Sequence, residues 1–203
     1  MMMNKRGFLL GLAALPLAGC AGGFRVSYDE GVSKSVSDQW RLSSISVDVP
    51  EDRTVSEANT LAPDAHIVWR EEPLGDRRAQ VRAIVQEGIT RPFRELRGSR
   101  GIHVRAQVIH FHAVTPRAVS VAPAAVHNVR YALQIFDAQT REPLTKTSNI
   151  SADLDAYVGA SAVTAALQGQ TQRVRIVDHI ARVQRGWLGR GADLRQEFTS
   201  LGR

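Results

Sequence analysis

The sequence predicts an α+β domain in which two main helices pack on one face of a largely antiparallel sheet of about four strands. Three observations predict this class. Apolar and polar residues alternate over residues 42–49, 102–114 and 126–137, as in half-buried strands. They recur at helical spacing over residues 76–98 and 171–188. The predicted order is therefore strand, helix, three strands and helix.

The first strand and the first helix have clear boundaries. Pro50 ends the strand over residues 42–49. Asp76 is a suitable N-cap for the helix, because its side chain can accept from the first unpaired amides. Pro92 has no amide donor and should kink the helix or restart it near Thr90. We expect the helix to end by Gly98.

The three central strands follow one another along the chain. Strict alternation over residues 102–114 places His110 and His112 on the same face as Val104 and Val108. Residues 126–137 form the next strand, with a shared face made by Val129, Tyr131, Leu133 and Ile135. Residues 137–143 form a turn, and a third, more polar strand covers residues 144–154. Antiparallel pairing of these neighbours is the simplest connection.

Two helices close the predicted domain. Residues 157–167 are rich in alanine and form a short helix that stops near Gly169. The final helix covers residues 171–188, with its inner face marked by Val174, Val177 and Ile180.

The N-terminus has the features of an export signal. Lys5 and Arg6 precede an apolar stretch over residues 8–17, which is too short to span a bilayer. Small residues then lead to Gly19 and Cys20, the only cysteine of the chain. This pattern resembles the lipobox of bacterial lipoproteins. The resemblance implies cleavage between Gly19 and Cys20, with acyl chains such as palmitate on the sulfur and on the new amine. An ordinary signal peptide with an incidental cysteine is the alternative.

By the same resemblance, Ala21 after the cysteine favours the outer membrane, whereas an aspartate there tends to retain a lipoprotein in the inner membrane. Acylated Cys20 would anchor the protein in the bilayer, facing the periplasm. The formal net charge of +6 would ordinarily suggest a nucleic-acid partner, but an exported protein does not meet one, so we expect none.

The domain organisation follows from this signal. Residues 1–19 are expected to be the signal peptide, and residues 20–40 an acylated cysteine followed by a flexible tether rich in glycine and serine. Residues 41–190 form the single periplasmic domain, which is long enough for a sizeable core. Residues 191–203 are expected to be a polar C-terminal tail.

Candidate metal ligands are few. His110 and His112 have a spacing that can serve a metal, and His127 at the start of the next strand could approach them. No acidic residue lies within either strand except Asp137 at a far end, so we favour two histidines at the solvated end of a core face. We expect no metal and no cofactor.

Catalytic groups are equally poorly supported. Ser161 lies in a helical context and lacks the glycine pattern of a nucleophile elbow. The paired carboxylates Glu71 and Glu72 lie in a turn, with no apolar pocket to separate their pKa values. Arginines at positions 91, 94, 97 and 100 could form an anion-binding stripe, but a solvated face is the preferred interpretation. We expect no enzyme activity.

Several stretches resemble a family of bacterial lipoproteins known only as a domain of unknown function. They are residues 55–59, 67–73, 75–81 and 169–176. More distantly, the run from Trp69 to Leu74 before a helix is similar to auxiliary lipoproteins of ABC-type envelope transporters. The turn from Asp137 to Leu144 also resembles turns in lipoproteins that assist secretion or surface assembly. None of these resemblances implies a catalytic residue.

The expected function is therefore that of an anchored, non-catalytic domain that binds an envelope protein complex, as an accessory subunit of a transport or assembly system. One alternative is a periplasmic carrier that holds a lipid or glycan between the sheet and the helices. A hydrolase or metal enzyme built around His110 and His112 is the third.

Overall fold

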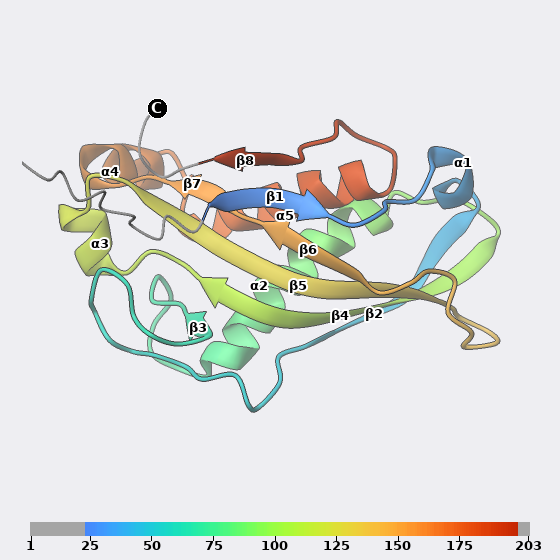
Figure 1. The fold of residues 1–203 in the computed structure, drawn as a ribbon, viewed down its shortest axis with the longest axis horizontal. Coiled ribbons are helices and arrows are strands. Elements are labelled where there is room, and N and C mark those ends of the chain that lie inside the picture. The colour runs from blue at the N-terminus through green and yellow to red at the C-terminus, as the bar shows by residue number, and fades with distance from the viewer. Residues whose placement is uncertain (1–22, 199–203) are drawn as a thin grey trace, which may run out of the picture.

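The computed structural model describes residues 23–198. Figure 1 shows one long, twisted sheet with two long helices, α2 and α5, side by side on one of its faces. The helices of the described part are α1 (Lys34–Ser37), α2 (Arg77–Phe93), α3 (Pro116–Val121), α4 (Gly159–Leu167) and α5 (Gln172–Trp187). The α+β class and the two main helices agree with the prediction.

The sheet has eight strands within residues 23–198, not about four. In spatial order its main path is β2 (Trp40–Asp48), β4 (Arg100–His112), β5 (Ala125–Asp137), β6 (Ser148–Ala152), β1 (Phe24–Tyr28) and β8 (Gln196–Phe198). Two short strands lie off this path: β3 (Ile67–Val68) pairs with β4, and β7 (Leu154–Ala156) pairs with β5. Strands β2 and β3 run parallel to β4, because the chain returns through α2 before it enters β4.

The core lies between the sheet and the two long helices. Ile84, Val85 and Ile180 are completely buried there. The two helices are in close contact at Gly88, where an added Cβ would lie 2.7 Å from the Cβ of Ile180. A side chain at this position would push the helices apart, so the glycine is required by the packing.

Helix α2 begins where predicted but does not restart near Thr90. The side chain of Asp76 accepts a hydrogen bond from the amide of Ala79 at 3.0 Å, which confirms it as the N-cap. The helix continues through Pro92 to Phe93. Pro92 lies in the last turn, where a missing amide removes only one backbone bond, and the buried ring packs in the core.

A β-bulge in β4 reverses the predicted faces of its second half. The register with β5 shifts between Val108 and His110, which leaves Ile109 as the extra residue. Beyond the bulge, Phe111 is buried in the core, while His110 and His112 lie on the opposite face. The prediction that these histidines share a face with Val108 is therefore wrong, because alternation holds only until a bulge inserts a residue.

Residues 24–40 are part of the folded domain and not a flexible tether. Strand β1 pairs antiparallel with β6 on one side and with β8 on the other, and Val26 and Tyr28 are buried. The apolar alternation at Phe24, Val26 and Tyr28 was the local signal of this strand. Its pairing partners lie more than one hundred residues away in the chain, so local spacing could not reveal them.

The predicted polar tail also contributes to the fold. Strand β8 pairs with β1, and Asp193 accepts a hydrogen bond from the hydroxyl of Tyr28 at 3.0 Å. The expected strand over residues 144–154 is shorter, since β6 begins only at Ser148. The predictions for the signal peptide, Gly19 and Cys20 fall outside the described residues.

Candidate functional site

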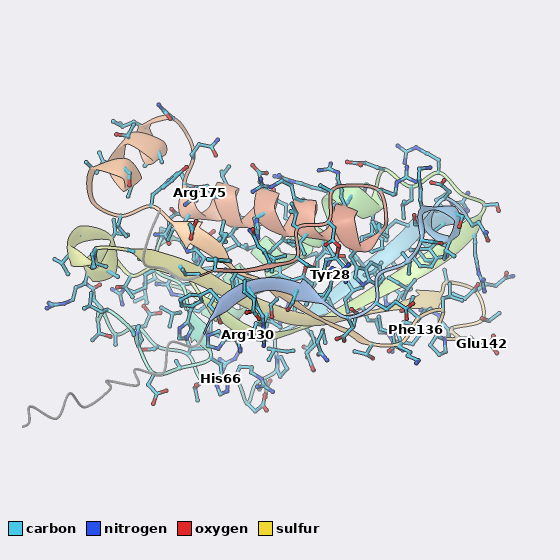
Figure 2. The ribbon with its side chains drawn as sticks, turned by 45° about the horizontal axis from the view of Figure 1, so that its top comes forward. Tyr28, His66, Arg130, Phe136, Glu142 and Arg175 are labelled. Atoms are coloured by element: carbon cyan, nitrogen blue, oxygen red, sulfur yellow. The ribbon has the colours of Figure 1, made fainter. Side chains whose placement is uncertain are left out.

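A cavity of about 620 Å³ opens at one end of the sheet, between β7, α4, α5 and β8. We call it the α4 cleft and define it by six of its lining residues: Tyr157, Ser161, Arg175, His179, Arg182 and Phe198. An adjoining hollow of about 550 Å³ shares Tyr157, Arg175 and Arg182 with it, so the cleft continues along α5. Figure 2 shows Arg175 at this end of the molecule, far from Glu142 at the other.

Arg175 is fixed in the wall of the cleft by two contacts. Its guanidinium lies 3.7 Å from the centre of the Tyr157 ring, a cation–π distance. It also donates to the backbone carbonyl oxygen of Asp155 at 2.6 Å. Burial lowers the pKa of Arg175, although an arginine remains charged at any physiological pH. The cleft therefore holds a preoriented, partly desolvated cation.

Arg182 is the second cation of the cleft, and it is more exposed. Its guanidinium lies 3.4 Å from Nδ1 of His179, and it forms no ion pair with a carboxylate among residues 23–198. The neighbouring arginines differ from Arg182 because they form ion pairs. Arg91 is paired with both Glu87 and Asp178, and Arg185 is paired with Glu95. Arg182 is thus available to an acceptor group from outside the domain.

Two buried histidines lie at the cleft: His179 lines it, and His127 is close to His179 and Arg175. Burial lowers the pKa of His127 to about 3 and that of His179 to about 4, so both rings are neutral at pH 7. Both nitrogens of His127 are buried with no hydrogen-bond partner in the described part of the chain. His127 therefore lies beside His179 and Arg175, and not beside His110 and His112 as the metal hypothesis required.

Asp153 is a buried carboxylate at the edge of the cleft, where β6 gives way to β7. Its two oxygens accept hydrogen bonds from the backbone amides of Arg25 at 3.1 Å and Val129 at 3.0 Å. Burial raises its pKa. Because both oxygens bind backbone amides of neighbouring strands, this carboxylate replaces the ladder bonds that the strand break removes.

The bulge brings a histidine cluster together on the sheet face away from the long helices. The rings of His110 and His112 lie 4.1 Å apart, and Nε2 of His112 is 2.5 Å from the carbonyl oxygen of Ala65. Burial lowers the pKa of His110 to about 4, with smaller contributions from His112 and Arg130. Figure 2 shows His66 and Arg130 on the same side of the molecule. Within residues 23–198, no group of three or more His, Cys, Asp or Glu side chains is placed to hold a metal ion.

The other predicted candidates have structural partners. The Ser161 hydroxyl donates to the carbonyl oxygen of Val158 at 2.7 Å. Glu71 accepts from the amides of Gln172 and Arg173 at the start of α5, which satisfies two of the unpaired donors there. Glu72 forms an ion pair with the Arg173 side chain at 2.9 Å. These groups stabilise the fold and form no catalytic constellation.

The predicted arginine stripe is also divided among separate contacts. Arg91 is ion-paired, Arg97 donates to the backbone oxygen of Arg94, and Arg100 forms an ion pair with Asp137 at 2.9 Å. The structure therefore does not assemble the four into one anion-binding surface.

An exposed apolar surface adjoins the α4 cleft. Helices α3 and α4 contact each other, and we call their outer surface the α3–α4 cap. The exposed fractions are 61% for Val121, 61% for Val163 and 84% for Leu167. A smaller hollow of about 250 Å³ runs between these helices and the start of α5. The sequence reasoning missed this surface, although the absence of charge over residues 157–170 was its signal.

The described part of the protein is thus a two-layer α+β domain with an arginine-containing cleft and an uncharged cap at one end. The chain belongs to a family of unknown function, DUF6778, whose family model matches residues 40–203. This agrees with the resemblance to lipoproteins known only as a domain of unknown function. The similarity to auxiliary lipoproteins of ABC transporters is not shown and stays a prediction. No curated protein matches the chain.

Solved structures with similar chains have low sequence identity. A proposed lipoprotein from Caulobacter crescentus CB15 is 12% identical, with 76% of this chain and 91% of that chain covered and a TM-score of 0.35. For the PelC dodecamer from Paraburkholderia phytofirmans these values are 9%, 76%, 95% and 0.33. For a DUF330 protein from Xanthomonas campestris they are 8%, 75%, 84% and 0.40. At these TM-scores we draw no functional inference from them.

Within residues 23–198, no helix has both the length and the apolar character needed to cross a bilayer.

Proposed function

We propose that this protein is a lipoprotein anchored in the outer membrane through acylated Cys20, with a periplasmic domain that binds a component of an envelope transport or assembly system without catalysing a reaction. The observation that carries the binding role is the α4 cleft. It presents Arg175 and Arg182 beside an exposed aromatic ring and an uncharged surface. Aromatic and arginine side chains are the groups most often enriched where proteins bind partners.

The anchor is supported by the sequence of the N-terminus. A short apolar stretch ends at Gly19 and Cys20, and this cysteine is the only one in the chain. More than one acyl chain on one residue exceeds what stable membrane attachment needs. Intact mass measurement of the mature N-terminal peptide should show acyl chains on Cys20, and Cys20→Ser should move the protein out of the membrane fraction. An unmodified cysteine, or an unchanged distribution of the serine variant, would contradict the anchor.

The binding role is tested by photo-crosslinking in cells. A photoreactive amino acid at position 182 lies in the cleft, and one at position 142 lies in the turn at the far end of the sheet as the matched control. We expect position 182 to capture one envelope protein and position 142 to capture none. If both positions give the same crosslinked proteins, or neither gives any, the proposal of a protein partner at the cleft is wrong.

A small-ligand carrier is the second candidate, because about 620 Å³ lies within the range of pockets that bind small molecules. Native mass spectrometry of the gently purified protein should then reveal an additional lipid or glycan mass. Arg175→Gln should remove this mass, while Arg130→Gln on the uncovered sheet face should retain it. The absence of any bound species would reject the carrier.

A further inference from the structure

We infer that the α3–α4 cap lies against the lipid bilayer, so that the domain touches the membrane with this end as well as through its acyl chains. The inference rests on the proposed acylation of Cys20 and goes beyond it, because an anchor alone does not say which surface of a domain faces the lipid. Three observations carry it: the composition of the cap, its position relative to the anchor, and the charges around it.

The cap is made from two chain segments without charge. Residues 118–129 and 157–170 contain no Asp, Glu, Lys or Arg, although 23% of the residues in the chain are charged. The two segments meet where α3 contacts α4. A single exposed leucine on a protein surface is ordinary, but a contiguous uncharged surface is typical of a contact with a partner or a membrane.

The exposed side chains of the cap are apolar or aromatic, as is common at the boundary between lipid and water. Leu167 is 84% exposed and Val163 is 61% exposed, both on α4, and Val121 is 61% exposed on α3. Tyr157 is 46% exposed beside them, with a ring that suits the boundary between lipid and water. A short helix that lies in the plane of the bilayer buries such residues among headgroups and upper acyl chains.

The position of the anchor selects the bilayer as the occupant. Phe24 begins β1 only four residues after Cys20, so their Cα atoms are at most about 14 Å apart. The rings of Phe24 and Phe198 are 6.3 Å apart, and Phe198 lines the α4 cleft together with Ser161 of α4. Figure 1 shows that β1 begins toward the α3–α4 end, whereas α1 lies at the opposite end. An acyl anchor on Cys20 would therefore lie within about 14 Å of the end of β1 that faces the cap.

The charges near the cap match an anionic membrane surface. Arg117 on α3 is in none of the ion pairs formed within residues 23–198. The nearby Glu71 accepts two amides at the start of α5, which compensates its charge. The Arg117 guanidinium at the headgroup level would meet lipid phosphates, as juxtamembrane cations commonly do.

The experiment uses the acylated protein on vesicles of phosphatidylethanolamine and phosphatidylglycerol in a 3:1 ratio. Cys20 is the only cysteine, and acylation consumes its thiol, so one introduced cysteine can be labelled alone with an environment-sensitive dye. Leu167→Cys reports on the cap, and Val36→Cys, 41% exposed in α1, is the matched control at the far end. Both side chains are exposed, so neither substitution disturbs the core.

We expect a quencher attached to the lipid acyl chains to quench the dye at position 167 several-fold more than the dye at position 36. Iodide in the water should show the reverse order. If position 167 stays in water while the mass of the protein shows acyl chains, the inference is overturned and the anchor stands, which leaves the cap free for a protein. If no acyl chain is found, or the dye reacts with Cys20, the proposed anchor fails and the inference fails with it.

Discussion

The two ends of the sheet are built differently. At the α1 end, charged side chains are paired with each other: Lys34 with Asp38 at 2.5 Å, Arg190 with the same Asp38, and Arg100 with Asp137 at 2.9 Å. At the α3–α4 end, two segments carry no charge and leave valine and leucine exposed. Figure 1 shows these ends at opposite extremes of the long axis.

Exposure alone therefore does not identify a contact surface. Both ends are exposed, but the paired charges of the α1 end are well solvated and compensated, so water is a suitable neighbour. The cap gains little from water, because its exposed side chains are apolar. A contact surface is thus distinguished by exposed side chains that are poorly stabilised by water in the free protein.

The contrast between the two ends depends on the helix layer, α2 and α5, that joins them. Disrupting the contact between these helices should have the largest effect on the free energy of unfolding. Gly88→Ala places a Cβ 2.7 Å from the Cβ of Ile180, which forces α2 and α5 apart. We expect a loss of about 2–3 kcal/mol in the free energy of unfolding, measured by denaturant titration. Gly75→Ala, whose Cβ would be 3.4 Å from the flexible end of Gln80, is the matched control. Equal stability of both variants would contradict the close helix contact.

Acid should weaken the α3–α4 end before the α1 end. His127 has its pKa lowered to about 3 by burial, whereas an unfolded chain has a value near 6.5. His127 therefore binds a proton in the unfolded state but not in the folded state, so the free energy of unfolding falls as pH decreases below 6.5. This single group should cost about 2 kcal/mol at pH 5. His127→Leu should flatten the decline of the unfolding free energy between pH 7 and pH 5.

The Asp137 carboxylate at the α1 end responds in a lower pH window. Backbone amides of Thr140 and Gln139, with Arg100, lower the pKa of Asp137 to about 2 from 3.8. Its contribution to stability is therefore complete above pH 4 and is lost only as pH falls through 2. Hydrogen exchange should show faster opening at residues 154–167 than at residues 134–145 when pH is lowered from 7 to 5. Uniform acceleration of both segments would contradict this order.

A smaller, local loss of stability is expected from the α1 end. Asp137→Ala removes the acceptor for the amides of Gln139 and Thr140 and the partner of Arg100. We expect the thermal midpoint to fall by a few degrees with no change at the α4 cleft. Glu142→Ala in the same turn removes an exposed side chain and should leave the midpoint unchanged. Similar midpoints for both variants would show that the Asp137 contacts are not important for the turn.

The smallest effect on stability should come from the cap. Leu167→Ser removes a side chain that is 84% exposed, so the free energy of unfolding should change by less than about 0.5 kcal/mol. Its lipid contact should nevertheless decrease, seen as weaker quenching of a dye placed at position 163 by lipid-borne quenchers. A large loss of stability would mean that Leu167 packs within the domain, which would remove the contrast between the ends.

Helices with strong caps were predictable from the sequence. The final helix was expected over residues 171–188, and α5 covers Gln172–Trp187, with the Thr171 side chain accepting from the amide of Val174 at 3.3 Å. The alternation of β5 was also confirmed, since Val129, Tyr131, Leu133 and Ile135 are buried together. These elements depend on neighbours within a few residues, which the local sequence contains.

Strand pairing over long distances was not predictable in the same way. Strands β1 and β8 are five and three residues long, and each gains its hydrogen bonds from a strand far along the chain. The bulge near Ile109 is likewise a property of the β4–β5 pair. Local spacing carries no information about such pairing. The predicted alternation of β4 therefore extends past Ile109, where the bulge exchanges the two faces.

The candidate site shows the same division. The sequence left open that His127 approaches His110 and His112. The bulge moves these two to the uncovered face, and His127 lies near His179 and Arg175 instead. Arg175, Arg182 and Tyr157 become a site only because α4 folds back beside α5. Their positions in the sequence do not show this.

The α+β class, the two long helices, the alternating β5 strand and the family resemblance could be predicted without a structure, because these follow from composition and local period. The folded structure was needed to show four further features. These are the eight strands of the described sheet, the place of residues 24–28 within it, the faces of the β4 histidines and the grouping of two arginines with an uncharged cap. The physical reason is that strand partners and cleft walls come from residues distant in the chain, whose meeting depends on the packing of the whole domain.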